Sequence, residues 1–345
     1  MSENKTLRLK KQYSLVAHSP DQVELRHGVW NAISLMITDD SKSGYLFRLL
    51  SRLDGASSAE EIARDENVPQ EEIEALLDHL VGMGLVENGP GTAIDYYLDS
   101  VVPWRTTTEV QGNRPIIFLG DADLAIEIQR YLRDALAGIE MIVPPSDDET
   151  WAALTDADNS WLSDGLLFHE KLIAFEAWRD AFIVYATKVI NPVHLRALNR
   201  VCLEYQIPWL HAAIDGPFLL VGPIIVPHRS ACYECLETRV TMNLRENASY
   251  QQYKRALVER QVREGQLPLE PAIVGLLASH SALEILNFSL TGSSFTVNKI
   301  LAIHLPTMEF AFNEVLRAPT CTACGSVPER DDTELYFDMA SLLKR

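Results

Sequence analysis

The chain has 345 residues, with 30 lysines and arginines against 48 aspartates and glutamates, and its formal net charge is −18. This acidity argues against nucleic acids and anionic membranes as partners, because both are bound mainly through lysine and arginine. The length predicts two domains, and an apolar content of 47% excludes a disordered chain.

Residues 1–88 are predicted to form a small winged-helix-like α+β domain. Alternating apolar residues first predict strands, and apolar residues spaced three to four apart then predict helices. Three strands followed by three helices is the winged-helix order. The predicted elements are strands at 13–17, 22–26 and 29–37, helices at 45–53, from Ser58 and from Pro69 to about Gly82, and a short strand at Leu85–Val86.

The predicted third helix carries four acidic residues between 70 and 82 and no lysine or arginine. A DNA-recognition helix needs basic or amide side chains that face phosphates and base edges, so DNA reading is excluded. Two uses remain for this domain. It is either purely structural, or it captures a peptide that adds as a strand beside Ala32–Ile37, with side chains in a groove against Leu76 or Leu80.

The rest of the chain is predicted to contain a connector at 89–113, an α/β domain at 114–330 and a tail at 331–345. Short buried-strand patterns alternate with helical patterns, which indicates a doubly wound parallel sheet with helices on both faces. The predicted strands are 115–119, 139–143, 181–186 and 207–212, and the predicted helices include 123–136 and 193–205.

Two Cys-x-x-Cys pairs, Cys232 with Cys235 and Cys321 with Cys324, are the sharpest chemical signal. Two such pairs complete a tetrahedral four-thiolate shell, which is typical of structural zinc because it leaves no open coordination position. A redox dithiol and coincidental buried cysteines are the alternatives. Cys202 lies mid-helix among apolar residues and is expected to be an inert core residue.

Five cysteines are too few for a disulfide scaffold, and no secretory signal peptide is recognisable. The longest uncharged stretches, around 217–227 and 271–283, fall short of the roughly 18 apolar residues of a membrane span. We therefore expect a cytoplasmic protein without a membrane partner. The charged stretch 243–266 is expected to be an exposed helix or crossing loop, and His211 a packed or hydrogen-bonded histidine.

With the strand order and both cysteine pairs in view, the second domain resembles the ThiF-type, ubiquitin-activating-enzyme-like fold. The stretch Val189–Gly216, with its Ile-Pro-Trp strand, looks like the central helix and following strand of that family. The stretches Pro271–Gly292 and Ile300–Pro306 look like its late helix and the strand that leads to the second cysteine pair.

The sequence departs from that family at each ATP-binding element. The turn after the first strand keeps one glycine, Gly120, and adds Asp121 and Asp123 where phosphate would meet a helix N-terminus. The family has an acidic residue after the second strand, and here none follows it. The family also has an Asp-rich turn before the central helix, and the corresponding residues here, Ala186–Asn191, include no aspartate. We therefore expect that this chain does not bind ATP.

A winged-helix module followed by a degenerate ThiF-type domain resembles one group in particular. These are the leader-peptide-binding partner proteins of azoline-forming cyclodehydratases, which act in the biosynthesis of thiazole/oxazole-modified microcins and related ribosomally made, modified peptides. The resemblance implies that the leader pairs with the third strand against the third helix. The implied peptide-binding residues are Ala32, Ile33, Ser34, Leu35, Met36, Ile37, Ile73, Leu76, Leu77 and Leu80.

The resemblance implies a non-catalytic scaffold that presents a precursor peptide to a separate YcaO-type, ATP-dependent cyclodehydratase. A flavin-dependent azoline dehydrogenase and a second copy of this chain are further partners to consider. The competing hypothesis is an active ThiF-like enzyme that adenylates a peptide carboxylate. A zinc-stapled interaction protein outside peptide modification is the third reading.

Overall fold

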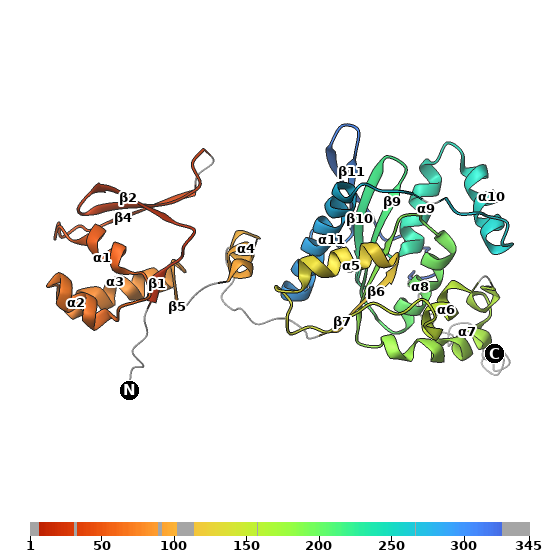
Figure 1. Ribbon diagram of the computed structural model, residues 1–345, viewed down its shortest axis with the longest axis horizontal. Helices are drawn as coiled ribbons and strands as arrows, with labels where there is room; N and C mark the ends of the chain where they lie inside the picture. The colour runs from red at the N-terminus through yellow and green to blue at the C-terminus, as the bar shows by residue number, and fades with distance from the viewer. Residues whose placement is uncertain are drawn as a thin grey trace, which may run out of the picture. The chain divides into compact units, whose positions relative to one another are not determined.

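The computed structural model describes residues 7–30, 33–88, 92–101, 114–156, 158–265 and 267–325. The chain divides into two compact units, residues 1–108 and 109–345, and each has its own sheets and its own buried core (Figure 1). The predicted tail at 331–345 and most of the predicted connector at 89–113 lie outside the described residues. The part of the connector that is described contains a helix, α4 (Ala93–Val101).

The first unit contains the three predicted strands and three predicted helices in the predicted order. The apolar side chains of the central strand, Val23 and Leu25, are fully buried against the helices. A capping box starts the second helix, because Ser58 accepts a hydrogen bond from the Glu61 amide and Glu61 accepts one from the Ser58 amide. The elements are β1 (Leu7–Leu9), β2 (Ser14–Ser19), β3 (Gln22–His27), β4 (Ile33–Thr38), α1 (Leu46–Arg52), α2 (Ala59–Glu66), α3 (Gln70–Gly82) and β5 (Val86–Asn88).

Two sheets form in this unit. One is a three-stranded antiparallel sheet in the order β2-β3-β4, and the other pairs β1 with β5. Strand β1 is an addition to the predicted elements: its Leu9 packs in the core, and its neighbour Arg8 forms an ion pair with Glu87 of β5. Among the described strands β4 pairs with β3 alone, so its other edge is free. Assignment of this unit to the winged-helix class stays a prediction.

The second unit is built on a seven-stranded sheet in the order β12-β11-β10-β9-β8-β6-β7. The predicted parallel arrangement holds for β7, β6, β8 and β9, whereas β10, β11 and β12 are antiparallel. The direction reverses because β9 and β10 are joined by a tight hairpin in which Gly216 has a positive φ of 54°. The strands are β6 (Ile116–Gly120), β7 (Met141–Ile142), β8 (Phe182–Thr187), β9 (Trp209–Asp215), β10 (Phe218–Ile225), β11 (Lys299–His304) and β12 (Glu309–Glu314).

Helices cover both faces of this sheet (Figure 1). Helix α5 packs against α11 on one face, while α8 packs against α9 on the other, over the core of Trp209, Phe175 and Trp178. Strand β8 is buried at every residue, as a central strand covered on both faces should be. The helices are α5 (Ala122–Leu132), α6 (Glu149–Thr155), α7 (Gly165–Leu172), α8 (Pro192–Glu204), α9 (Tyr233–Asn243), α10 (Asn247–Val258) and α11 (Pro271–Thr291).

Helix α11 is longer than the uncharged stretch that the sequence suggested. Its 21 residues and hydropathy of 1.4 meet the length and composition of a membrane span, contrary to the sequence expectation. Half of that stretch is buried in the protein, against α5 and the sheet. The helix also buries the carboxylate of Glu284, which accepts hydrogen bonds from the amide and hydroxyl of Thr296 at 2.8 and 2.6 Å. This packing is that of a core helix.

Candidate functional site

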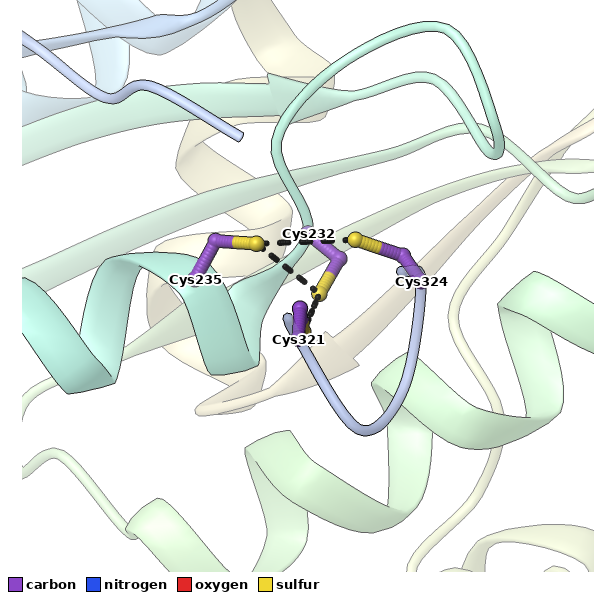
Figure 2. Close-up of side chains that lie close together, drawn as sticks. All are labelled: Cys232, Cys235, Cys321 and Cys324. Atoms are coloured by element: carbon purple, nitrogen blue, oxygen red, sulfur yellow. Dashed lines mark hydrogen bonds between the residues drawn. The ribbon is translucent and has the colours of Figure 1, made fainter. Parts of the chain in front are cut away.

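The four predicted cysteines lie together in the second unit. Cys232 and Cys235 stand at the start of α9, and Cys321 and Cys324 come from the loop after β12 (Figure 2). Their Sγ atoms all lie within 4.8 Å of one another. The closest pairs are Cys235–Cys324 at 3.5 Å, Cys232–Cys321 at 3.6 Å and Cys232–Cys235 at 3.9 Å. The two sequence motifs therefore form one cluster.

These distances fit a tetrahedral zinc ion. With Zn–S bonds of about 2.3 Å, neighbouring sulfurs of a regular tetrahedron are about 3.8 Å apart. Burial raises the pKa of Cys324 to about 11 and raises that of Cys232 further, because a thiolate is poorly solvated in this position. A bound cation would supply the charge that stabilises the four thiolates. The residues present thus fit a closed, structural metal site.

Contacts outside the thiolates hold the two cysteine segments in place. The Ala318 amide donates to Cys235 Sγ at 3.3 Å, and the Arg317 guanidinium donates to the backbone oxygens of Cys324 and of His228. At Gly325, a Cβ atom would lie 2.4 Å from the Cys321 backbone oxygen, so only glycine fits at this position of the loop. The cluster joins the start of α9 to the end of the last sheet hairpin.

Cys202 lies outside the cluster, fully buried in α8 within the main core. Burial raises the pKa of its thiol well above the ordinary value, so it is held as the neutral thiol. This placement agrees with an inert core residue.

At the turn between β6 and α5, the carboxylates of Asp121 and Asp123 occupy the helix N-terminus and bind Lys188. Asp121 accepts a hydrogen bond from the Lys188 amide at 2.6 Å, and the Lys188 ammonium pairs with the Asp123 carboxylate. The Asp121 amide donates to the Ala186 oxygen at 2.8 Å, and the Leu124 amide donates to Asp123 at 3.0 Å. Two of the amides that a phosphate would meet at this helix N-terminus, those of Asp121 and Leu124, are therefore already bonded to protein oxygens.

Beside this turn lies a cavity of about 550 Å³ lined by Gly120, Thr187, Asn191 and Glu264 among others. Asn191 caps helix α8 by accepting hydrogen bonds from the amides of Val193 and His194. Asp148, the acidic residue that precedes α6, caps that helix by accepting a hydrogen bond from the Trp151 amide. The side chain of Asn191 is thus engaged by the start of its own helix.

Substituting Gly120 by alanine should destabilise the second unit by several kcal/mol. Gly120 has a φ of 101°, and a Cβ atom there would lie 2.1 Å from the Ala186 backbone oxygen. To relieve this clash, β6 and β8 would have to separate, which would break the pairing of these central strands. The measurement is chemical denaturation of the full chain, with Gly138→Ala, where a Cβ meets nothing within 4 Å, as the control. Equal stability of the two variants would contradict this account.

In the first unit, a groove of about 530 Å³ runs between the free strand β4 and helix α3. Three of the residues predicted to bind a peptide line it: Met36, Ile37 and Leu76. Tyr45, at the start of α1, lines it too and donates its hydroxyl to Glu72. Further lining residues that sequence reasoning missed are Asp39, His79 and Met83.

The other proposed peptide-binding residues are placed differently. Ile73, Leu77 and Leu80 are buried in the core beneath the groove and do not line it. Ile33 and Ser34 are exposed at the start of β4, where Ile33 is 73% accessible, and Leu35 is half-buried against the core. Ala32 lies outside the described residues.

Comparison with known proteins gives a likeness of fold. No family model matches the chain. One curated protein, HesA of Leptolyngbya boryana, is 27% identical over 129 residues, which are 37% of this chain and 39% of HesA. A structure of the heterocyclase TruD is 22% identical with a TM-score of 0.66, and the match covers 93% of this chain and 43% of that one.

A structure of E. coli MccB with AMPCPP and MccA is 15% identical with a TM-score of 0.51, covering 92% of this chain and 99% of MccB. The chain therefore shares the mixed α/β fold of TruD and MccB, with a large sheet and a four-cysteine cluster of its own. It spans about two fifths of the length of HesA and of TruD.

Proposed function

We propose that this chain is a non-catalytic scaffold that binds the leader of a ribosomal precursor peptide. It presents that peptide to a separate YcaO-type, ATP-dependent cyclodehydratase for thiazoline or oxazoline formation. The observation that carries the proposal is the free edge of β4 facing α3 across a groove. An extended leader would pair with β4 as a fourth strand and place alternate side chains in the groove.

Two further observations support a peptide of this kind. Asp39 and Glu72 lie in the groove wall, and α3 exposes further carboxylates, so basic leader residues would meet opposite charge. The fold likeness to TruD, a heterocyclase, supports a role in making heterocycles from a peptide. Holding the leader raises the effective concentration of the core peptide at the partner enzyme, which would act in the cytoplasm.

The ATP-using step is assigned to the partner because of the contacts at the β6–α5 turn. Asp121 and Asp123 hold Lys188 there, and the amides of Asp121 and Leu124 donate to protein oxygens. Phosphate would have to displace two carboxylates and would be repelled by them. Zinc in the four-cysteine cluster would be structural, since four thiolates leave no position for substrate.

The alternative, an enzyme that adenylates a peptide carboxylate, has two observations in its favour. The 550 Å³ cavity beside Gly120 is large enough for a nucleotide, and a structure of MccB, which has a similar fold, was solved with AMPCPP. This alternative requires the Lys188 contacts to open when nucleotide binds.

One experiment separates the two functions. The purified full chain should bind a fluorescent synthetic leader of a candidate precursor peptide at micromolar or tighter affinity. With the full-length precursor that contains this leader, the chain alone should give no ATP–pyrophosphate exchange. When the partner cyclodehydratase and ATP are added, the precursor should lose water, which mass spectrometry detects. Exchange by the chain alone would overturn the scaffold role in favour of adenylation. Absence of leader binding would overturn it as well.

A further inference from the structure

The apolar face of β4 extends beyond the peptide groove. Ile33, Leu35 and Ile37 alternate along β4, so they lie on one face of the sheet, the face that packs against the helices. Their exposure falls along the strand: Ile33 is 73% accessible, Leu35 is half-buried and Ile37 is 8% accessible. Within the described residues, the helices therefore cover the Ile37 end of β4, where the groove lies, and leave the Ile33 end open.

The turn that leads into β4 adds two large apolar side chains to this open end. Trp30 is completely exposed and Val29 is 75% accessible, and the turn projects clear of helices α1 to α3 (Figure 1). The Arg26 guanidinium holds the turn by donating to the backbone oxygens of Gly28 at 3.2 Å and Val29 at 2.7 Å. Exposed apolar residues that gather on one surface mark interaction sites, and tryptophan is enriched among the residues that contribute most to binding.

Pairing along β4 determines which side chains of an added strand would meet these residues. Among the described strands, β4 pairs with β3 alone over Ile33–Thr38, so its other edge is open along this whole length. Residues opposite each other on neighbouring strands point to the same face of the sheet, and the side-chain period is two. A strand that covers this edge in either direction therefore sets one side chain beside Ile33 and another beside Ile37. These two side chains are four residues apart, or about 13 Å at about 3.3 Å per residue.

We infer that the leader carries two large apolar residues four positions apart, one in the groove beside Ile37 and the other against Ile33 and Trp30. The inference rests on the proposed function, because it takes strand addition at β4 as given. A leader that filled the groove alone would leave Ile33 and Trp30 in water, whereas the second apolar residue would cover them. A polar residue at either position would be desolvated against apolar side chains without a hydrogen-bond partner.

The test is a serine scan of a fluorescein-labelled synthetic leader of a candidate precursor peptide, with affinity for the full chain measured by anisotropy. The two most sensitive apolar positions of the leader should be four residues apart, and serine at either should weaken binding at least fivefold. Ile33→Ser and Trp30→Ser in the chain should each weaken the unmodified leader at least fivefold. In double-mutant cycles, both variants should remove the sensitivity to serine at the same one of the two leader positions and keep it at the other.

Val16→Ser is the matched control, because Val16 is also an exposed branched residue of an outer strand but lies on β2, at the opposite edge of the sheet. It should bind the leader within twofold of the unmodified chain. If the leader binds but ignores Ile33→Ser and Trp30→Ser, or if its sensitive positions are not four apart, this inference is wrong and the proposed function is unaffected. If the leader does not bind the unmodified chain, both are wrong. If Trp30→Ser keeps leader affinity and weakens association with the cyclodehydratase, the turn contacts that enzyme and the inference is overturned.

Discussion

Replacing Cys321 by serine should lower the thermal unfolding temperature of the second unit by about 8–16 °C and release its zinc. The loss corresponds to about 4 kcal/mol, at about 2–4 °C per kcal/mol for a domain of this size. The cause is local: Cys321 Sγ lies 3.6 Å from Cys232 Sγ, and the cluster ties α9 to the loop after β12. Without the metal, the remaining buried thiolates must take up protons and the loop loses its anchor.

The measurement combines a circular dichroism melt with metal content by mass spectrometry. The unmodified chain should carry one zinc ion per chain, and a strong chelator should reproduce the variant's melting temperature. Cys202→Ala is the matched control, because Cys202 is buried in the same unit but lies in the core away from the cluster. The zinc content of this variant should be unchanged, and its loss of stability should be that caused by a small cavity in the core. Metal-free chain with an unchanged melting temperature would contradict a structural zinc site.

Motif spacing explains why the cysteine cluster could be predicted from sequence. Two residues between thiolates orient both sulfurs toward one point, and that local geometry holds whatever fold surrounds it. Lys188 could not be found in the same way. Its partners Asp121 and Asp123 stand more than sixty positions earlier, and only the pairing of β6 with β8 brings them together. No local pattern encodes that contact.

The buried strands of the second unit could likewise be predicted, because continuous apolar runs such as Phe182–Thr187 are typical of strands covered on both faces. In the antiparallel half of the sheet, β11 matches the strand expected at Ile300–Pro306, whereas β10 and β12 were not predicted. Strand β12 is exposed at every residue, and β10 is interrupted by Gly222 and Pro223, so neither has the pattern of a buried strand. Their position depends on hairpin pairing rather than on burial.

The groove in the first unit shows a different limit of sequence reasoning. An apolar stripe on a helix marks the side that packs, and on α3 that stripe is Ile73, Leu77 and Leu80, which fill the core. The groove is formed by the neighbouring positions, such as Leu76 and His79, at the edge of the stripe. Apolar periodicity alone does not separate the two sets, since both lie on the same side of the helix.

Met36→Asp should weaken leader binding at least tenfold, a loss of about 1.4 kcal/mol or more. Met36 is 45% exposed on β4 and lines the groove, so it is available to a bound peptide without being required in the core. An aspartate there would remove apolar contact and add a carboxylate that becomes desolvated when a peptide covers it. The measurement is fluorescence anisotropy of a labelled synthetic leader with the full chain.

The opposite edge of the same sheet supplies the control for this test. Val16 on β2 is 37% exposed and lies one strand beyond β3, so Val16→Asp adds the same charge at a comparable position away from the groove. Its affinity for the leader should stay within twofold of the unmodified chain, and Met36→Leu should also retain binding because the apolar contact is kept. If Val16→Asp weakened the leader as much as Met36→Asp, the added charge and not the β4 edge would explain the loss. Strand addition at β4 therefore requires the two aspartate variants to differ.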